Sequence, residues 1–106
     1  MLFSILNQSV APNITQSPQS ITVRAGTDII LECRATGDPV PLVEWLRNGQ
    51  SLAPVYAITA TPGYGRLLIK YSSTGDSGVY RCRFTNVGGT ALSDLCDVKV
   101  NGNTVY

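Results

Sequence analysis

Glycine and proline divide this chain so finely that it cannot form long helices. Its 106 residues include 10 glycines and 6 prolines, which interrupt nearly every apolar stretch. No segment of ten or more residues repeats apolar positions at intervals of three, four and seven, the pattern of a helix with one buried side. The chain therefore has to fold mainly from strands and turns.

Several short stretches alternate in the way that strands do. Ile29, Leu31 and Cys33 share one parity, and Glu32 and Arg34 share the other. Because successive side chains of a strand point to opposite faces, the first set is predicted to face a core. Further strands are predicted at 21–24, 42–47, 55–59, 67–71, 79–85 and 90–100, with a hairpin connection at 86–89. Seven to eight strands separated by turns predict an all-β sandwich or barrel.

Composition bounds the class of protein. Hydrophobic residues make up 43% of the chain and charged residues 14%, which indicates a globular domain, and the length fits one such domain. The formal net charge is +1, so no overall field attracts nucleic acid or an anionic membrane. We predict one domain that binds no nucleic acid.

The chain lacks the residues and motifs that most enzymes and metal sites use. The chain has no histidine, which removes the commonest general base near neutral pH and the commonest metal ligand. Its three cysteines lack the C-x-x-C spacing of redox and zinc sites. Paired carboxylates and a phosphate-binding glycine loop are also missing. We predict that the chain is not an enzyme and has no cofactor, metal or catalytic residue.

Both ends of the chain are predicted to be tails outside the folded domain. The apolar stretch at 1–6 is shorter than the roughly 7–15 residues of a signal peptide, and no Lys or Arg precedes Arg24. No run approaches the roughly 18–20 apolar residues of a membrane span, so no membrane insertion is expected within this segment. We predict a flexible N-terminal tail at 1–11, a folded domain at 12–100 and a C-terminal tail at 101–106.

One constellation identifies the kind of sandwich. Cys33 and Cys82 lie 49 positions apart, Trp45 follows the first cysteine by 12, and Tyr80 stands two residues before the second. This combination resembles the immunoglobulin superfamily. The stretches at 35–41, 47–49 and 86–89 resemble its intermediate set, the I-set, and the resemblance spans Pro12 to Val100.

The resemblance implies a structure and several residue roles. It implies two antiparallel sheets with Greek-key connections, joined by a Cys33–Cys82 disulfide on which Trp45 packs. It also implies that the Tyr80 hydroxyl anchors a corner and that Asp76 braces the turn before Tyr80. Together with the alternation of the strands, it predicts a core that contains Leu31, Trp45, Leu67, Ile69 and Tyr80.

Three residues depart from the I-set pattern. Ser72 stands four before Asp76, where such domains usually place an apolar residue, and Phe84 stands inward where a small residue is more usual. Cys96 is additional and shares parity with the inward positions of the last strand. It is predicted to be a buried, inert thiol, or alternatively a bridge to another chain. A shift of one residue in register would turn it to solvent.

Two kinds of surface feature suggest contacts. Asn7 and Asn13 begin acceptor sequons for N-linked glycan. Parity places a mixed set of side chains on the outer side of the later strands, predicted to contact a protein or simply to be solvated: Glu44, Leu46, Arg81, Arg83, Thr85, Leu95, Asp97 and Lys99. The loops at 37–41 and 86–89 are expected at one end of the sandwich, as a junction with a neighbouring domain.

Two functions fit these observations. The first is a protein-binding or adhesion module of an extracellular or cell-surface receptor, adhesion or matrix protein, because the disulfide and the sequons are typical of secreted domains. The alternative is a cytoplasmic, sarcomeric module of a giant filament protein, in which the cysteines stay reduced. The expected partner is another protein or a neighbouring domain, with a homodimer as an open alternative.

Overall fold

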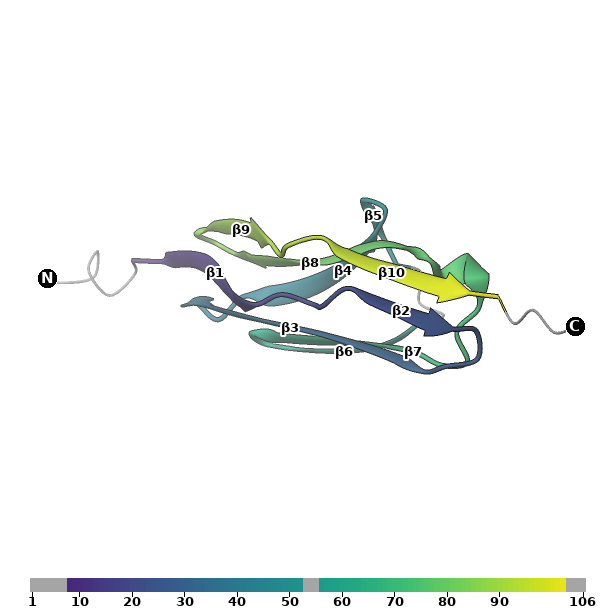
Figure 1. Ribbon diagram of the computed structural model, residues 1–106. Coiled ribbons are helices and arrows are strands. Elements are labelled where there is room, and N and C mark those ends of the chain that lie inside the picture. The colour runs from purple at the N-terminus through teal and green to yellow at the C-terminus, as the bar shows by residue number, and fades with distance from the viewer. Residues whose placement is uncertain (1–7, 53–55, 103–106) are drawn as a thin grey trace, which may run out of the picture.

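Two β-sheets pack face to face in the computed structural model, which describes residues 8–52 and 56–102 (Figure 1). The first sheet runs in the order β1 (Val10–Gln16), β3 (Ile29–Asp38), β7 (Tyr64–Ile69), β6 (Ala57–Thr61). The second runs in the order β2 (Ile21–Arg24), β10 (Cys96–Asn101), β8 (Gly78–Asn86), β4 (Leu42–Arg47), β5 (Gln50–Ser51), with β9 (Gly89–Leu92) also paired to β8. The predicted all-β sandwich is confirmed.

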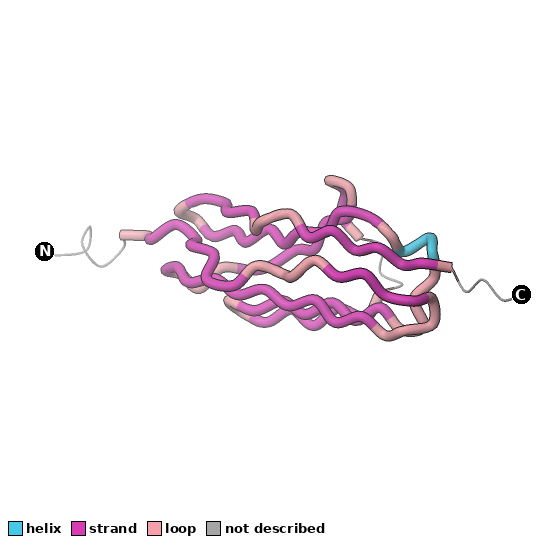
Figure 2. Tube along the Cα trace, viewed as in Figure 1, coloured by secondary structure: helices cyan, strands magenta, loops and turns pink. Residues whose placement is uncertain are grey.

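Nearly all of the described chain is strand or connecting loop (Figure 2). A short 3-10 turn, η1 (Thr74–Asp76), is the exception. All strand pairs are antiparallel except β2 with β10, which run parallel. The chain crosses from the first sheet to the second between β1 and β2, where Pro18 cannot donate to a ladder.

The described chain enters at one end of the sandwich and leaves at the other (Figure 1). β1 begins at Val10, inside the stretch predicted as a tail, because Val10 pairs with Asp38. β10 continues through Asn101, which pairs with Arg24. The first and last strands therefore extend one or two residues into the segments predicted as tails.

The core follows the alternation of the strands. The side chains at every second position of β3, β7, β8 and β10 are buried between the sheets. The buried cluster includes all the core positions expected from the sequence: Leu31, Cys33, Trp45, Leu67, Ile69, Tyr80 and Cys82. Phe84 is also fully buried. A disulfide joins Cys33 of β3 to Cys82 of β8 and closes a loop of 49 residues, which in the chain-entropy account stabilises by about 4 kcal/mol.

Gly65 lets the tryptophan lie against the opposite sheet. It stands on β7 with its missing side chain directed at β4: a Cβ there would lie 2.8 Å from Val43 Cγ2 and 3.1 Å from Trp45 Nε1. Glycine within a strand weakens it, and a close approach of this kind is a common reason for its presence. The arrangement leaves Trp45 Nε1 without a hydrogen-bond partner in the described part of the chain.

The predicted last strand, 90–100, is interrupted by a β-bulge. Ser93 bonds to Cys82 through its backbone N–H, 2.9 Å from the Cys82 carbonyl, and Cys96 is the register partner of Tyr80. Asp94 and Leu95 together therefore oppose Arg81 alone. The extra residue reverses parity, so Ser93 and Cys96 are both buried although they are three positions apart. This corrects the prediction of a continuous strand.

Candidate protein-contact face

The outer side of the second sheet combines exposed leucines with an ion pair. Glu44 on β4 and Arg83 on β8 are register partners, and Leu92 on β9 is the next residue across from Arg83. Leu42 lies two residues before Glu44 on the same strand, and Leu95 lies in the bulge beside β8. We call these five residues the leucine face: Leu42, Glu44, Arg83, Leu92 and Leu95.

The ion pair on this face is accessible. Arg83 Nη2 donates to Glu44 Oε1, and Ser51 Oγ donates to Glu44 Oε2. The bond from Ser51, followed by the one from Arg83, lowers the pKa of Glu44. The Arg83 and Glu44 side chains are 41% and 42% exposed. An exposed pair of this kind contributes little to stability, so both groups remain available to a partner.

The leucines supply apolar area around this pair. Leu42 is 67% exposed, Leu92 47% and Leu95 59%. Single exposed leucines are ordinary. Three on one face around a charged pair give the mixture of apolar area and arginine that protein contacts favour. Physically, the leucine face can bury apolar surface and bond to a polar or charged group of a partner.

One residue predicted for this contact is not available. Leu46 is only 6% exposed, although it is outside the core cluster. It lies in the middle of the sheet between its register partners Ser51 and Arg81, so neighbouring strands flank it on both sides. This corrects the prediction that Leu46 is an exposed contact residue.

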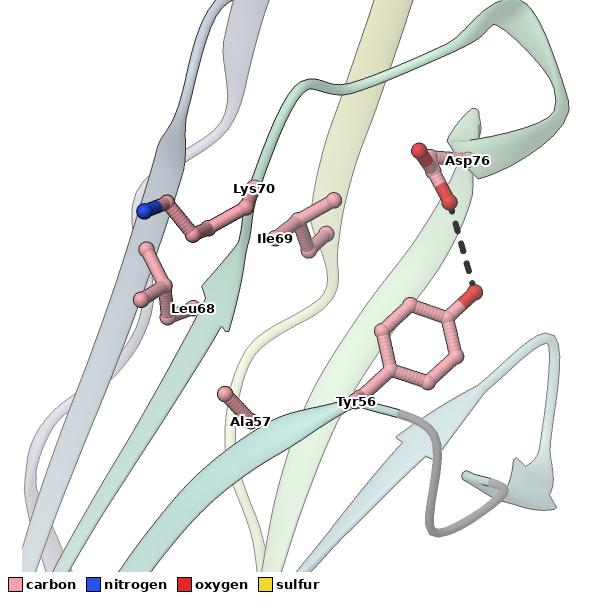
Figure 3. Close-up of a pocket in the computed structure, with 6 residues that line it drawn as sticks. All are labelled: Tyr56, Ala57, Leu68, Ile69, Lys70 and Asp76. Atoms are coloured by element: carbon pink, nitrogen blue, oxygen red, sulfur yellow. Dashed lines mark hydrogen bonds between the residues drawn. The ribbon is translucent and has the colours of Figure 1, made fainter.

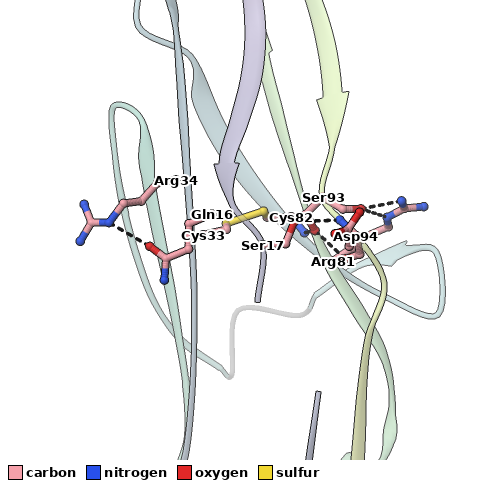
Figure 4. Close-up of a disulfide and its surroundings, with 8 residues drawn as sticks. All are labelled: Gln16, Ser17, Cys33, Arg34, Arg81, Cys82, Ser93 and Asp94. Carbon is pink, nitrogen blue, oxygen red and sulfur yellow. Dashed lines mark hydrogen bonds between the residues drawn. A yellow bond between two sulfur atoms is a disulfide. The ribbon is translucent and has the colours of Figure 1, made fainter. Parts of the chain in front are cut away.

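The Arg81 side chain bonds to the bulge and is only partly exposed. Its Nε and Nη2 both donate to the carbonyl oxygen of Ser93, at 3.1 and 2.6 Å. Figure 4 shows these bonds on one side of the disulfide, beside the bond from the Asp94 backbone to Ser17 Oγ, which is 3.0 Å long. The half-buried guanidinium therefore holds the bulge in place, while Asp97 and Lys99 remain exposed on β10.

Two members of the leucine face were missed by the sequence analysis. Leu42 shares parity with Glu44 on β4, so the alternation could have indicated it. Leu92 lies before the bulge and has the same parity as the inward residues of β10. Alternation counted back from β10 therefore predicts that Leu92 faces inward, whereas it faces outward. The bulge itself left no clear signal in the sequence.

Cys96 lies between the sheets as a free thiol. Its side chain has no exposed surface, and Sγ donates to the Gln19 carbonyl at 3.3 Å. Burial raises the pKa of this thiol to about 11, with a smaller contribution from Asp97. Because the thiolate is the reactive form, the site favours the inert thiol over a bridge to another chain.

Asp76 is surrounded by bonds that hold the corner. Its carboxylate accepts from the Ser73 backbone N–H at 2.8 Å and from the Tyr56 hydroxyl at 3.4 Å. The Tyr80 hydroxyl donates to the Asp76 carbonyl at 2.6 Å. These contacts are those of a turn brace and a tyrosine corner.

A surface hollow of about 400 Å³ lies next to this corner (Figure 3). Tyr56, Ala57, Ile69, Lys70 and Asp76 contribute to its lining. In Figure 3 the Lys70 side chain extends away from Asp76, so the two charged groups do not converge on one point. Within the described residues no group of three or more metal-ligating side chains is found.

The two loops expected at one end do meet. Asn86 Nδ2 donates to the carbonyl oxygens of Val10, at 2.7 Å, and Pro39, at 2.9 Å. This one amide joins the start of β1 to both loops. The apolar tips Val40 and Val87 remain 55% and 85% exposed.

The sequons lie near the start of the chain. Asn13 is exposed on β1, opposite Thr36 of β3. Asn7 lies outside the described residues. None of the helices in the described part is long and apolar enough to cross a membrane.

Comparison with known proteins bears on both family and location. Hemicentin-2 of Mus musculus is 47% identical over 72 residues, which are 68% of this chain and 1% of hemicentin-2. Netrin receptor DCC of Rattus norvegicus is 35% identical over 85 residues, which are 77% of this chain and 6% of the receptor. The chain thus spans a small fraction of these relatives.

Among solved structures, a chain of the complex of titin M10 with the Ig domain of obscurin-like 1 matches with a TM-score of 0.81 and 30% identity, over 91% of this chain and 99% of that one. Both predicted locations, extracellular and sarcomeric, therefore have representatives among the relatives. The immunoglobulin I-set family matches residues 12–100, nearly the whole described chain. The chain is an immunoglobulin I-set domain.

Proposed function

We propose that this domain is a non-catalytic protein-binding module of an extracellular receptor, adhesion or matrix protein, and that the leucine face makes the contact. The observation that carries the proposal is the exposure of Leu42, Leu92 and Leu95 around the Glu44–Arg83 pair. The buried Cys33–Cys82 disulfide, which persists in oxidising compartments, supports the extracellular location.

The partner of such a face is a protein with its own apolar patch and a group that bonds to arginine or carboxylate. Contacts of this type concentrate their energy in a few central residues. Arg83 lies between its register partners Glu44 and Leu92, so it is the expected centre of the contact, and Leu92 is its apolar neighbour.

A binding experiment tests the contact. The domain would be clustered on fluorescent beads and applied to cells of its source, and Leu92→Asp is expected to reduce binding about tenfold or more. The matched control is Ile30→Asp, because Ile30 is 51% exposed on the outer side of the other sheet. Equal losses in the two variants, or no loss with Leu92→Asp, would contradict the proposal.

The filament module remains the second candidate, favoured by the similarity to titin. The redox state distinguishes the two. Protein from its natural source would be alkylated under denaturing conditions before reduction, and its peptides mapped by mass. A Cys33–Cys82 bridge with one alkylated thiol at Cys96 supports the extracellular module. Three alkylated cysteines support the filament module instead.

A further inference from the structure

β6 is an open edge without the features that usually protect edge strands. It ends the first sheet, pairs only with β7 in the described part of the chain, and keeps an unbroken register over all five residues. Its sequence, Ala-Ile-Thr-Ala-Thr, contains no charge, proline or glycine. Edge strands normally carry a charge, a proline or a bulge, because their free N–H and C=O groups can pair with another chain.

The other edges in residues 8–52 and 56–102 are protected in different ways. β1 contains Pro12 and two shifts of register, and β5 is only two residues long. β2 is four residues long and ends in Arg24. β9 begins with Gly89, where an added Cβ would lie 3.5 Å from Ala11 Cβ of β1. The contrast makes β6 the edge best suited to pairing.

A second observation points to a missing neighbour. Ile58 is the register partner of Leu67, whose side chain is fully buried, so Ile58 faces the interior of the sandwich. It nevertheless remains 39% exposed. All five residues of β6 are exposed, although alternate ones face inward. A strand placed beside β6 would cover the open side of Ile58.

We propose that β6 pairs with β6 of a second copy of this chain, antiparallel and across a two-fold axis at Thr59. In this register Thr59 lies opposite itself, Ile58 opposite the partner's Ala60, and Ala57 opposite the partner's Thr61. Directly opposite residues of an antiparallel pair share a face. Each inward Ile58 therefore meets a small inward alanine, and the two four-stranded sheets become one.

The charges nearby permit this arrangement. Arg66 on β7 is the register partner of Thr59, so it is the charge closest to the axis in its row. Its counterpart in the second copy would lie three strand spacings away, about 14 Å. That distance exceeds the Debye length of about 8 Å at physiological salt, so their repulsion is largely screened. The pairing closes on itself, because the same strand is used by both copies.

The proposed surface is independent of the leucine face, which lies on the other sheet. With five residues paired, the dimer is expected to be weak and transient. Sedimentation velocity of the whole chain, over a series rising to about 1 mM, should show a monomer–dimer equilibrium that does not proceed to larger species.

Thr59→Lys is the first test. It places two lysines directly opposite each other on the axis and should weaken dimerisation about tenfold or more. Thr59 is exposed, and circular dichroism and the melting temperature would show that the variant folds. The matched control is Thr90→Lys, which makes the same change at an exposed threonine of β9. It should leave dimerisation unchanged.

Mixing variants tests the register itself. The Thr59→Lys variant, labelled with a dye, would be mixed with each of three unlabelled partners. Its dimerisation should be strongest with Thr59→Glu, weaker with the unmodified chain and weakest with Thr59→Lys. That order supports the proposal. A chain that stays monomeric at about 1 mM, a dimer insensitive to Thr59→Lys, or a mixture without the stated order would each overturn it.

Discussion

Two regions of this domain each bury one serine, and the two hydroxyls differ in their hydrogen bonding. At the bulge, Ser93 is 1% exposed, and Oγ accepts from the Cys82 N–H at 3.0 Å and donates to the Asp94 carbonyl at 3.0 Å. At the turn after β7, Ser72 is 2% exposed, and Oγ has no hydrogen-bond partner within the described residues.

The difference shows when a buried hydroxyl is useful. At Ser93 it replaces a backbone acceptor that the bulge has moved out of register. At Ser72 the backbone already makes its bonds, since Ser72 N–H donates to the Thr27 carbonyl at 3.1 Å and its own carbonyl accepts from Gly26 N–H at 2.6 Å. The hydroxyl there fills a site that an apolar group would fill at lower cost.

The largest effect is expected at the bulge. Ser93→Ala leaves the buried Cys82 N–H without its partner and should lower the free energy of unfolding by about 2 kcal/mol. Denaturation at constant slope would measure the loss. Hydrogen exchange at the Cys82 amide should accelerate by a corresponding factor. An unchanged denaturation midpoint would show that the Ser93 hydroxyl is not needed to hold the bulge.

The opposite sign is expected at the turn. Ser72→Ala removes a buried hydroxyl that has lost its bonds to water, and should raise the free energy of unfolding by about 1 kcal/mol. Ser73→Ala is the matched control, because Ser73 is the next residue and is exposed. It should give no gain. If Ser72→Ala were less stable than the original chain, the hydroxyl would have to make a bond in solution.

The same two serines show what a sequence can predict. The sequence marked Ser72 as unusual, because the I-set pattern places an apolar residue four before Asp76. It gave no sign of the role of Ser93. Alternation predicts faces while a strand is uninterrupted, as for Leu31, Leu67 and Ile69 in the core. It fails after an inserted residue, because each later side chain then changes face.

The same limit of strand alternation explains which residues of the candidate site were predicted from the sequence and which were missed. Leu92 precedes the inserted residue and was missed, and Leu46 has the parity of an outward residue but is only 6% exposed at its place between Ser51 and Arg81. Burial on the outer face depends on neighbours that are distant in sequence. Glu44 and Arg83 were found because β4 and β8 pair without interruption.

A further effect near the bulge is confined to high pH. The folded chain raises the pKa of Cys96 to about 11, above its ordinary value near 9, so the fold disfavours the thiolate. The contribution of Cys96 to stability should therefore be constant below pH 9 and fall between about pH 9 and 11 as the unfolded chain releases the proton. Burial raises the pKa of Tyr80 as well, which acts in the same direction.

Cys96→Ala isolates the contribution of the thiol. Free energies of unfolding of both proteins would be measured at pH 8 and 10.5, with intact mass used to exclude exchange with the disulfide. The original chain should lose more stability than the variant, while Tyr80 affects both equally. Equal losses would mean that the thiolate is no less favourable inside the fold than in the unfolded chain.

The smallest effects are expected where the bulge region meets the link between β1 and β2. Ser17 Oγ accepts from Asp94 N–H at 3.0 Å, and Ser20 Oγ accepts from Asp97 N–H at 2.9 Å. These bonds resemble that of Ser93 in chemistry, but both are exposed, so water can replace the serine. Ser17→Ala and Ser20→Ala should each cost about 0.5 kcal/mol, measured by denaturation as for Ser93→Ala. If either loss were as large as that of Ser93→Ala, these bonds would be needed to hold the link between β1 and β2 in place. Burial would then not determine how much a serine hydrogen bond contributes to the free energy of unfolding.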